Sequence, residues 1–527
     1  MKRKKSFRAD RARQTMNVGK AAKVARFIHD FRRVAILLGP IQWRRFFEQG
    51  GTNSRAKEAQ DQAKRFNHIC GAAPVQMAHD QVAGQFDSWI SNRANDFYDL
   101  VCESSLPKKT RAALYSVNKQ KAWFIRGDVR LLEKNKKGHW RPTGPVIGEL
   151  ERKLARAIMR QAMKGHRRPN LARISPCIDD RIATVAPSRK AKHGGLWLSL
   201  TRPNPRMANA PKGQRRPADI IQIPIYPADT FTQRGGAISN MLHICIEKDG
   251  QIGVRLLSNM AEKFAAERAT YTPKIDDFGI DFGLTTLIAT SEGDLFGRGL
   301  FNDLKRIDRQ ITGIARHRQR IGGKARDSER YDRLTTRVRG MLKTRINAAL
   351  NRIVEIHKPA ALTVERLDFR MPTMSKRMNR IIQNCGRAVF KAKLKDLEER
   401  FGIVAPEVPA FYTSQECSSC HYVDEDNRGK GNHRSKFLCR FCGKKKHADV
   451  NGSCTIKQRR RRSAVLCDKY QKKSVILAEL VQPFCERYPR PLGTAADPRL
   501  TNPYFKDWSV AARMLATQGV VPCVQKQ

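Results

Sequence analysis

The sequence is short of acidic residues, and it lacks any long hydrophobic run. Asp and Glu number 49 against 102 Lys and Arg in 527 residues, which gives a formal net charge of +53. No stretch of about eighteen apolar residues occurs, so no membrane-spanning helix is expected. The basic N-terminus MKRKKSFRAD is not followed by an apolar segment of signal-peptide length. We therefore expect a cytoplasmic protein.

A disulfide framework is also not indicated. The chain has 13 cysteines, an odd number, and most of them are isolated from one another in the sequence. In a large chain without a secretion signal, isolated cysteines are expected to be ordinary thiols of a reducing compartment.

The excess of positive charge predicts a polyanionic partner. A compact body with this charge repels itself unless an anion offsets it. Apolar residues make up 40% of the chain, which is enough for folded cores, and the basic residues run through the folded-looking segments. Nucleic acid is therefore the expected partner, and the alternatives are an anionic membrane surface or a general contribution of the charge to solubility.

The pattern of residues along the chain predicts several domains. Residues 1–170 place apolar residues at three- and four-residue spacing, as in VARFIHDFRRVAILLG, and predict a helical basic region. Residues 171–270 contain short runs such as DIIQIPIYP between turn residues, which predict a β-rich domain. From 271 onward strands alternate with helices, which is typical of an α/β fold.

Two long helical patterns, separated by the turn IGGKARDSER, follow the first strands of the α/β region. Their polar faces carry basic residues with few alternating acids: Arg306, Arg309, Arg316, Arg320, Lys324, Arg326, Arg330, Arg337 and Arg345. A solvated helix face is the ordinary explanation, but the scarcity of acids favours contact with phosphates. The run from Arg459 to Arg462 is likewise expected to be a phosphate-binding patch rather than a nuclear signal.

Four cysteines have the spacing of a structural zinc site. Cys417 and Cys420 form one CxxC pair, and Cys439 and Cys442 form a second after eighteen intervening residues. Four thiolates complete a tetrahedral Zn²⁺ shell with no open position, so we expect this zinc to be structural.

Three acidic residues occupy positions where a negative charge costs free energy unless a partner or a metal ion offsets it. Asp281 lies in the apolar strand FGID, Glu365 ends the strand ALTVE, and Asp449 follows the second CxxC pair. Each has an ordinary alternative: a strand-edge acid, an ion pair of Glu365 with Arg366, or a helix N-cap at Asp449. Together they could hold two divalent cations about 3.5–4 Å apart, the arrangement that hydrolyses phosphodiesters. Mg²⁺ is the expected ion and Mn²⁺ the alternative.

These segments resemble a known family. GIDFGLTTLIAT, the basic helical hairpin, LTVERLDF and the two CxxC pairs followed by KKHADVNGSCTI resemble the RuvC-type nuclease domain of TnpB proteins and miniature type V CRISPR effectors. The resemblance spans about residues 276–457. It implies an RNase-H-like fold, Asp281, Glu365 and Asp449 as catalytic metal ligands, and Arg428 near the scissile phosphate. It also implies a guide RNA and a DNA target, double-stranded and single-stranded, as partners.

The resemblance gives a multidomain α+β organisation with these expected parts: a helical recognition region over 1–170; a wedge-like β-rich domain over 171–270; the nuclease domain over 271–416; a zinc-binding, target-nucleic-acid insert over 417–442; the third nuclease motif over 443–470; and a C-terminal extension over 471–527.

The resulting prediction is an RNA-guided, Mg²⁺-dependent DNA endonuclease, most consistent with a compact type V CRISPR effector. Three alternatives remain open: a transposon-encoded TnpB-type nuclease, a guided DNA-binding protein with little cleavage activity, and an unguided resolvase or transposase. Presence of all three acids argues against the binding protein. The zinc insert and large basic N-terminal half argue against the unguided enzyme. The sequence does not distinguish a monomer from a homodimer.

Overall fold

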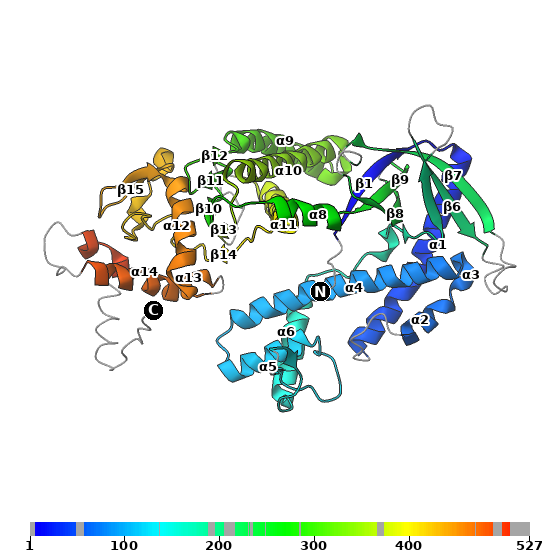
Figure 1. Cartoon of the computed structure of the whole chain (residues 1–527), viewed down its shortest axis with the longest axis horizontal. Coiled ribbons are helices and arrows are strands. Elements are labelled where there is room, and N and C mark those ends of the chain that lie inside the picture. Colours follow the sequence, from blue (N-terminus) through cyan, green and yellow to red (C-terminus); the bar gives the residue numbers. More distant parts are fainter. Residues whose placement is uncertain are drawn as a thin grey trace. The chain divides into compact units, whose positions relative to one another are not determined.

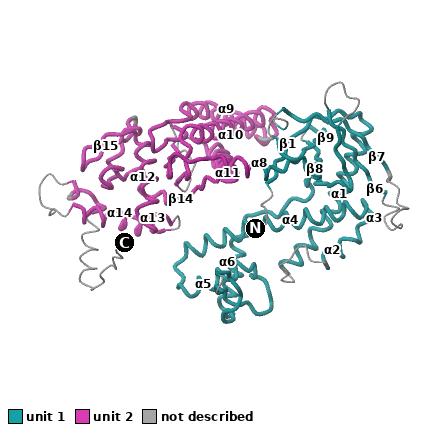
Figure 2. The backbone as a smooth tube through the Cα atoms, viewed as in Figure 1, with its two compact units in different colours: residues 1–263 teal, residues 264–527 magenta. Residues whose placement is uncertain are grey.

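The computed structural model divides the chain into two compact units, residues 1–263 and residues 264–527 (Figure 2). The structure describes residues 6–48, 57–135, 138–187, 195–204, 217–229, 231, 235–247, 249–283, 286–365, 374–468, 471–488 and 498–505. In these residues no helix combines the length and apolar character needed to cross a membrane.

A seven-stranded, fully antiparallel sheet forms part of the first unit, with the strand order β4-β8-β9-β1-β7-β6-β5 (Figure 1). Its strands are β1 (Phe7–Gln14), β4 (Cys177–Ile178), β5 (Ala183–Pro187), β6 (Leu196–Pro203), β7 (Pro217–Pro227), β8 (Ala237–Ile246) and β9 (Ile252–Asn259). The central position of β1 corrects the helical expectation for residues 7–14. On β7, Ile221, Ile223 and Ile225 are buried at alternate positions, so one face of the strand lies in the core.

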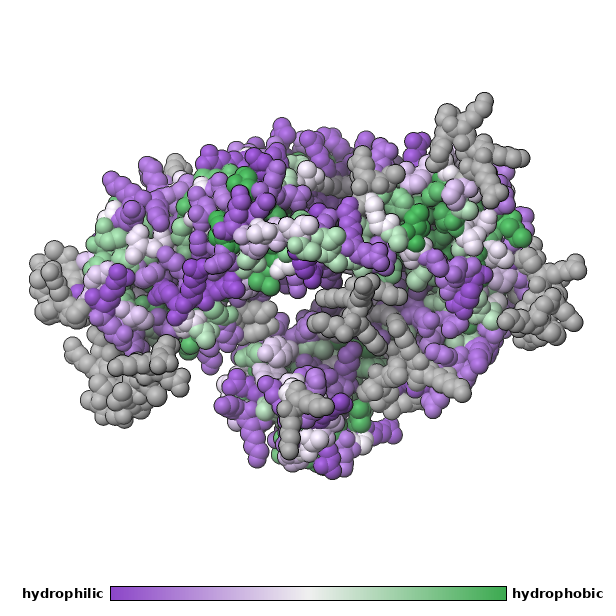
Figure 3. Space-filling view, in the orientation of Figure 1, coloured by the Kyte–Doolittle hydropathy of each residue, from purple (hydrophilic) through white to green (hydrophobic). Residues whose placement is uncertain are grey.

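The other face of this sheet carries exposed apolar side chains, among them Ile220 and Tyr226 of β7. Apolar residues are visible over these strands in Figure 3, whereas hydrophilic residues cover most of the face shown. Scattered apolar residues are normal on protein surfaces, so this face by itself indicates no partner.

Helices make up the rest of the first unit: α1 (Val18–Trp43), the π-helix η1 (Arg44–Glu48), α2 (Lys57–Lys64), α3 (Asn67–Cys70), α4 (Ala72–Cys102), α5 (Lys108–Lys119) and α6 (Glu149–Met163). The side chain of Asn17 accepts a hydrogen bond from the Lys20 N–H and caps the start of α1. Phe27, Phe31 and Val34 are buried on one face of α1, as their spacing predicts. A short hairpin, β2 (Glu133–Lys134) and β3 (Trp140–Arg141), lies between α5 and α6.

The second unit contains a five-stranded mixed sheet with the order β12-β11-β10-β13-β14. Its strands are β10 (Phe278–Asp281), β11 (Ile288–Thr290), β12 (Leu295–Phe296), β13 (Leu362–Glu365) and β14 (Glu407–Val408). The first three form an antiparallel meander, and β13 and β14 continue the sheet parallel to β10. The sheet therefore brings the carboxyl ends of β10 and β13 to the same edge.

The helices of the second unit are α9 (Leu300–Arg320), α10 (Glu329–His357), α11 (Lys376–Phe401), α12 (Ala448–Arg462), α13 (Ala464–Cys467) and α14 (Lys473–Arg487), while α8 (Ala261–Thr270) crosses the boundary between the units. The two expected basic helices are α9 and α10, which pack side by side (Figure 1). Their apolar stripes, including Leu304, Ile311 and Leu342, are buried in one core with the sheet.

The C-terminal segment completes the core around the cysteines. Tyr422 stacks on Phe505 and Phe441, with ring centroids 5.2 and 5.6 Å apart, and Phe484 of α14 packs against the same cluster. The cysteine segment is thus covered by residues more than 40 positions further along the chain. A hairpin of β15 (Lys436–Leu438) and β16 (Lys445–His447) leads from this segment into α12.

Candidate functional site

The four predicted zinc ligands come together. Among the residues that the structure describes, Cys417, Cys420, Cys439 and Cys442 are the one group of three or more potential ligands whose ligand atoms all lie within 4.8 Å of one another. The Cys417 and Cys442 Sγ atoms are 3.8 Å apart, and those of Cys420 and Cys439 are 3.6 Å apart. A tetrahedral zinc with Zn–S bonds of about 2.3 Å has sulfurs about 3.8 Å apart, so the cluster fits this ion.

Backbone N–H groups support the cluster. The Ser419 N–H donates to the Cys417 Sγ at 3.4 Å, and the Cys442 N–H donates to the Cys439 Sγ at 3.5 Å. Such bonds stabilise thiolates, the form in which cysteine binds a metal.

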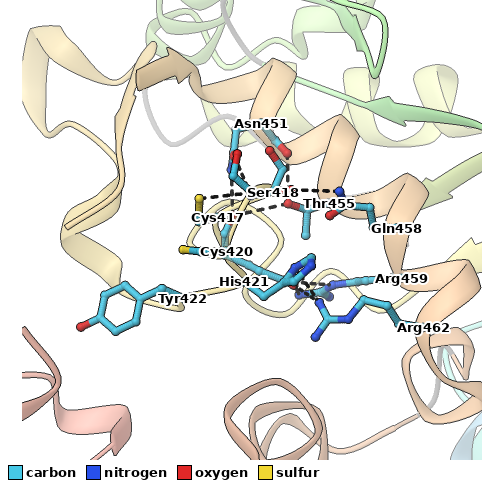
Figure 4. A network of polar contacts seen from close by, with 12 residues as sticks. Cys417, Ser418, Cys420, His421, Tyr422, Asn451, Thr455, Gln458, Arg459 and Arg462 are labelled. Carbon is cyan, nitrogen blue, oxygen red and sulfur yellow. Dashed lines mark hydrogen bonds and ion pairs between the residues drawn. The ribbon is translucent and has the colours of Figure 1, made fainter. Parts of the chain in front are cut away.

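The first CxxC pair is fixed to α12 by buried polar contacts (Figure 4). The Asn451 amide accepts from the Ser418 N–H at 3.0 Å and donates to the Glu416 carbonyl at 2.8 Å. Gln458, two turns further along α12, donates to the Ser418 carbonyl at 2.9 Å. Because Asp449 lies in the first turn of the same helix, the cysteine cluster and this acid are built on one element.

A buried ion pair completes this attachment. Glu416 and Arg459 are both fully buried, and the guanidinium donates to the carboxylate at 3.0 and 3.2 Å. Arg462 also pairs with Glu416, and His421 lies 3.2 Å from it. Burial alone would raise the pKa of Glu416, but Arg459, His421 and Arg462 outweigh it and hold this pKa below its usual value.

These contacts correct the expectation for the arginine run. Arg459 and Arg462 pair with Glu416, and Arg460 pairs with Asp277 at 3.3 Å. Three of the four arginines therefore hold α12 in place rather than forming an open phosphate patch. Arg461 is exposed, as expected for a residue of a phosphate-binding patch.

Asp281 and Glu365 end neighbouring parallel strands. Ile280 is the register partner of Val364, so the next residue on each strand is one of the two acids. Asp281 and Asp449 are buried, and Glu365 is half-buried. The three side chains interact electrostatically: burial first, and then the charges of Glu365 and Asp449, raise the pKa of Asp281 well above its usual value.

Two glycines let α12 approach the sheet. A Cβ added to Gly279 of β10 would lie 2.0 Å from the Ser453 carbonyl oxygen of α12, so only glycine allows this packing distance. A Cβ on Gly452 would lie 2.7 Å from the Asp281 Oδ2. The glycine in VNGSC therefore leaves the space that the Asp281 carboxylate occupies.

Arg428 is the cation paired with this acidic group. Its guanidinium donates to the Asp449 Oδ1 at 2.8 Å and to the Arg434 carbonyl at 3.2 Å. The N-cap alternative for Asp449 is wrong, because His447 occupies the N-cap position and Asp449 is the second residue of α12. Arg366, the alternative partner of Glu365, lies outside the described residues.

The acidic group has the chemistry of a divalent-cation site, although its carboxylates are less tightly grouped than the cysteine sulfurs. Burial raises the pKa of Glu365 as well as that of Asp281, because it disfavours the charged form of both carboxyl groups. A divalent cation would offset this charge, and oxygen ligands suit Mg²⁺. The donor set therefore fits the expected ion.

Thr413 is a neighbour of this group that the sequence did not single out. Its Oγ1 lies 3.0 Å from the Glu365 Oε2, and this hydrogen bond opposes the rise in the pKa of Glu365. Arg459 donates to the Pro409 and Phe411 carbonyls, at 3.0 and 2.8 Å, and so holds the loop that carries Thr413. The loop sequence YTSQEC contains no pattern that would have indicated this contact.

The basic residues expected on α9, α10 and their connection are exposed, as a phosphate-binding surface requires: Arg306, Arg309, Arg316, Arg320, Lys324, Arg330, Arg337 and Arg345. Arg306 pairs with Asp303 at 3.4 Å, and no ion pair joins the other seven to a described acid. The side chain of Arg326 lies outside the described residues.

Comparison with known proteins gives one family match. A family described as Cas12f1-like, TNB domain matches residues 388–456, which include α12 and all four cysteines. No curated protein matches the chain.

Several solved structures have a slight likeness to the chain. A Cas12f1-sgRNA-target DNA complex is 12% identical, covering 86% of this chain and 98% of that chain, with a TM-score of 0.24. CasPhi-2 (Cas12j) bound to crRNA is 12% identical, with coverages of 86% and 97% and a TM-score of 0.39. The mini-RNA-guided endonuclease CRISPR-Cas_phi3 is 11% identical, with coverages of 86% and 92% and a TM-score of 0.39. Scores this low carry no conclusion about the fold.

Proposed function

We propose that this chain, a member of the family of TnpB proteins and miniature type V effectors, is an RNA-guided DNA endonuclease with a single RuvC-like active site. The observation that carries the proposal is the placement of Asp281 and Glu365 at the ends of neighbouring parallel strands, with Asp449 beside them on α12. The antiparallel meander followed by two parallel strands supports an RNase-H-like fold for this unit. The protein would act in the prokaryotic cytoplasm.

The three acids would hold two Mg²⁺ ions, or Mn²⁺ in their place, which supply an activated water and neutralise the leaving oxygen of the phosphodiester. Asp281 and Asp449 present their carboxylates from two elements that the glycines allow to approach closely. Glu365 is oriented by Thr413. Arg428 has one guanidinium nitrogen on Asp449 and would turn toward the scissile phosphate when cations bind the acids.

Guide RNA and target DNA would be the partners, with both DNA strands cut in turn as single strands. Sequence would be read by base pairing, while the protein contacts backbones and a short flanking motif. The exposed arginines of α9 and α10 would contact phosphates of the guide and heteroduplex. The recognition region and the wedge-like domain, which make up the N-terminal half, would recognise the flanking motif. The zinc-binding insert would bind the target nucleic acid.

Replacing Asp281 tests the active site. With guide RNA, Mg²⁺ and a plasmid target, Asp281→Ala should lower the cleavage rate at least about a thousandfold, which corresponds to about 4 kcal/mol of barrier. It should leave guided DNA binding within about threefold. Glu355→Gln, an exposed acid on α10, is the matched control and should cut like the wild type. Wild-type cleavage by Asp281→Ala would remove this assignment.

Sequencing the RNA that co-purifies with the protein from its native host tests guidance. A repeat joined to varied spacers would identify a CRISPR effector. A single RNA from the edge of its own gene would identify a transposon-encoded nuclease. Random fragments would contradict guidance by RNA.

A further inference from the structure

Trp140 differs from the other tryptophans in its exposure. Among the described residues, it is the one tryptophan that is exposed, with 48% of its surface accessible. Trp123 is fully buried, and Trp43 and Trp89 are half-buried against the core of the first unit. Leaving an indole ring in water forgoes a large hydrophobic gain, and an exposed indole becomes a candidate contact for a partner where its position is fixed and its surroundings are charged.

The hairpin that carries Trp140 is anchored rather than loose. Val129 and Ile147 at its base are buried, and the Ile147 N–H donates to the Val129 carbonyl at 2.8 Å. Near its tip, the Asn135 N–H donates to the His139 carbonyl at 2.9 Å. Two contacts dock the hairpin on the end of α5: the Leu132 N–H donates to Ser116 Oγ at 3.1 Å, and the Gln120 amide donates to the Arg130 carbonyl at 2.8 Å. The ring is therefore held in place before any partner binds.

Two lysines flank the ring. Lys134 is the cross-strand partner of Trp140, and its Nζ lies 5.4 Å from the ring centroid. Lys119, the last residue of α5, places its Nζ 4.7 Å from the same ring. Their flexible stems can move aside from the ring face while their charges stay beside it.

The charge around the hairpin indicates the chemistry of the partner. Residues 108–141 contain eleven Lys and Arg but only two acids, Asp128 and Glu133. Glu133 is the cross-strand partner of Arg141 and accepts from Thr143 at 3.3 Å, so it lies beside a cation. An aromatic face in a segment where cations greatly outnumber acids suits a nucleobase with its phosphates. It does not suit a peptide that is apolar and has few acidic residues.

We propose that Trp140, with Lys119 and Lys134, forms a stacking site for an unpaired nucleotide of RNA or DNA. The base lies on the indole, and the two ammonium groups contact the adjoining phosphates. The proposal rests on the proposed function only in requiring a nucleic-acid partner, and it stands whether or not the chain cleaves DNA.

The test compares binding of short oligo(U) and oligo(dT) by the full-length protein freed of RNA. The measurements are made at high salt, because salt weakens the general attraction between the +53 charge and the phosphates. Stacking then contributes a larger share of the affinity. Trp140→Ala should lower the affinity for at least one oligonucleotide about tenfold, the effect of losing one stacked base. Trp140→Phe, which keeps an aromatic face, should bind within about threefold of the wild type.

Leu150→Ala is the matched control, because Leu150 is an 80% exposed apolar residue on α6, and it should leave affinity unchanged. If Trp140→Ala loses affinity for oligo(U) alone, the stacked nucleotide comes from RNA. If it loses affinity for oligo(dT) alone, the nucleotide comes from DNA. Substituting both lysines by glutamine removes two contacts to phosphates. The slope of the logarithm of the binding constant against the logarithm of the salt concentration should then fall in magnitude by about 1.4, or about 0.7 for each contact to a single strand.

Trp140 is exposed, so the thermal unfolding curves of its variants should match the wild type. Equal affinity of Trp140→Ala and the wild type for both oligonucleotides would overturn the proposal. So would an equal loss in Trp140→Phe and Trp140→Ala. Neither result would bear on the cleavage test with Asp281→Ala, so failures of the two proposals are distinguishable.

Discussion

The hydroxyl of Thr413 has two acceptors within reach, and this decides how it can serve Glu365. Its Oγ1 lies 3.0 Å from the Glu365 Oε2 and 3.1 Å from the Ala410 carbonyl oxygen. It donates to Glu365 when that carboxyl is ionised. When the carboxyl is protonated, the hydroxyl oxygen can accept a hydrogen bond from the carboxyl O–H and donate to the Ala410 carbonyl instead. Thr413 therefore keeps one orientation of Glu365 in both protonation states.

Removing this hydroxyl should impair cleavage in a pH-dependent way. Thr413→Val has a similar shape but no hydrogen bond, and bonds to charged groups contribute about 1.5–3 kcal/mol, so cleavage should fall about ten- to hundredfold. The lost bond lowers the pKa of Glu365 in the wild type, so the variant's pKa should rise. Cation binding needs the ionised carboxylate, and the acid limb of the pH–rate profile should therefore move to higher pH.

Thr413→Ser is the matched control, because it restores the hydroxyl, and it should return both the rate and the acid limb to near wild-type values. A profile for Thr413→Val that keeps its acid limb but loses rate would indicate a purely structural role for this residue.

At the scale of elements, α12 connects the cysteine cluster, the acidic group and the sheet. Arg459 contributes most to this connection, since its fully buried guanidinium holds Glu416 and two carbonyl groups of the preceding loop. Breaking a buried pair by removing one partner leaves an uncompensated charge. Arg462 still pairs with Glu416 and limits the cost.

Arg459→Met should therefore lower the free energy of unfolding by about 3 kcal/mol, near the lower end of the range for buried pairs. Arg461→Met is the matched control in the same run of arginines. Because Arg461 is exposed, its replacement should change stability by less than about 0.5 kcal/mol. Denaturant unfolding of both variants checks this, and equal losses would contradict the structural role of Arg459.

The sequence predicted elements where local signals and long-range packing agree. The apolar stripes of α9 and α10 and the spacing of the cysteines are local patterns, and the structure confirms the helices and the cluster. Parallel pairing of β10 with β13 explains why two strand-end acids meet.

What the sequence did not predict depends on distant partners. The strand β1, with the charged sequence FRADRARQ, is stabilised by pairing with β7 and β9, more than 200 residues later. Arg459 lies in a run typical of exposed charge, and its partner Glu416 is 43 residues away. A run of four arginines gives no indication of which one faces an acid in the folded chain.

At the scale of the whole molecule, each hydrophobic core lies within one of the two units. In the described part of the chain, one core lies entirely within residues 1–263. The other three lie within 264–527, and they include the cluster around the cysteines. A segment of more than 250 residues with its own cores is long enough to fold alone.

A fragment of residues 261–527, which begins at the start of α8, should therefore fold without the first unit. We expect one zinc per chain, since all four ligands and the aromatic cluster over them are present, and a cooperative denaturant transition. Cys439→Ser in the same fragment should lose the zinc and unfold at lower denaturant, because three ligands leave the shell incomplete. An aggregated fragment, or one that melts without cooperativity, would mean that the second unit depends on the first for its stability.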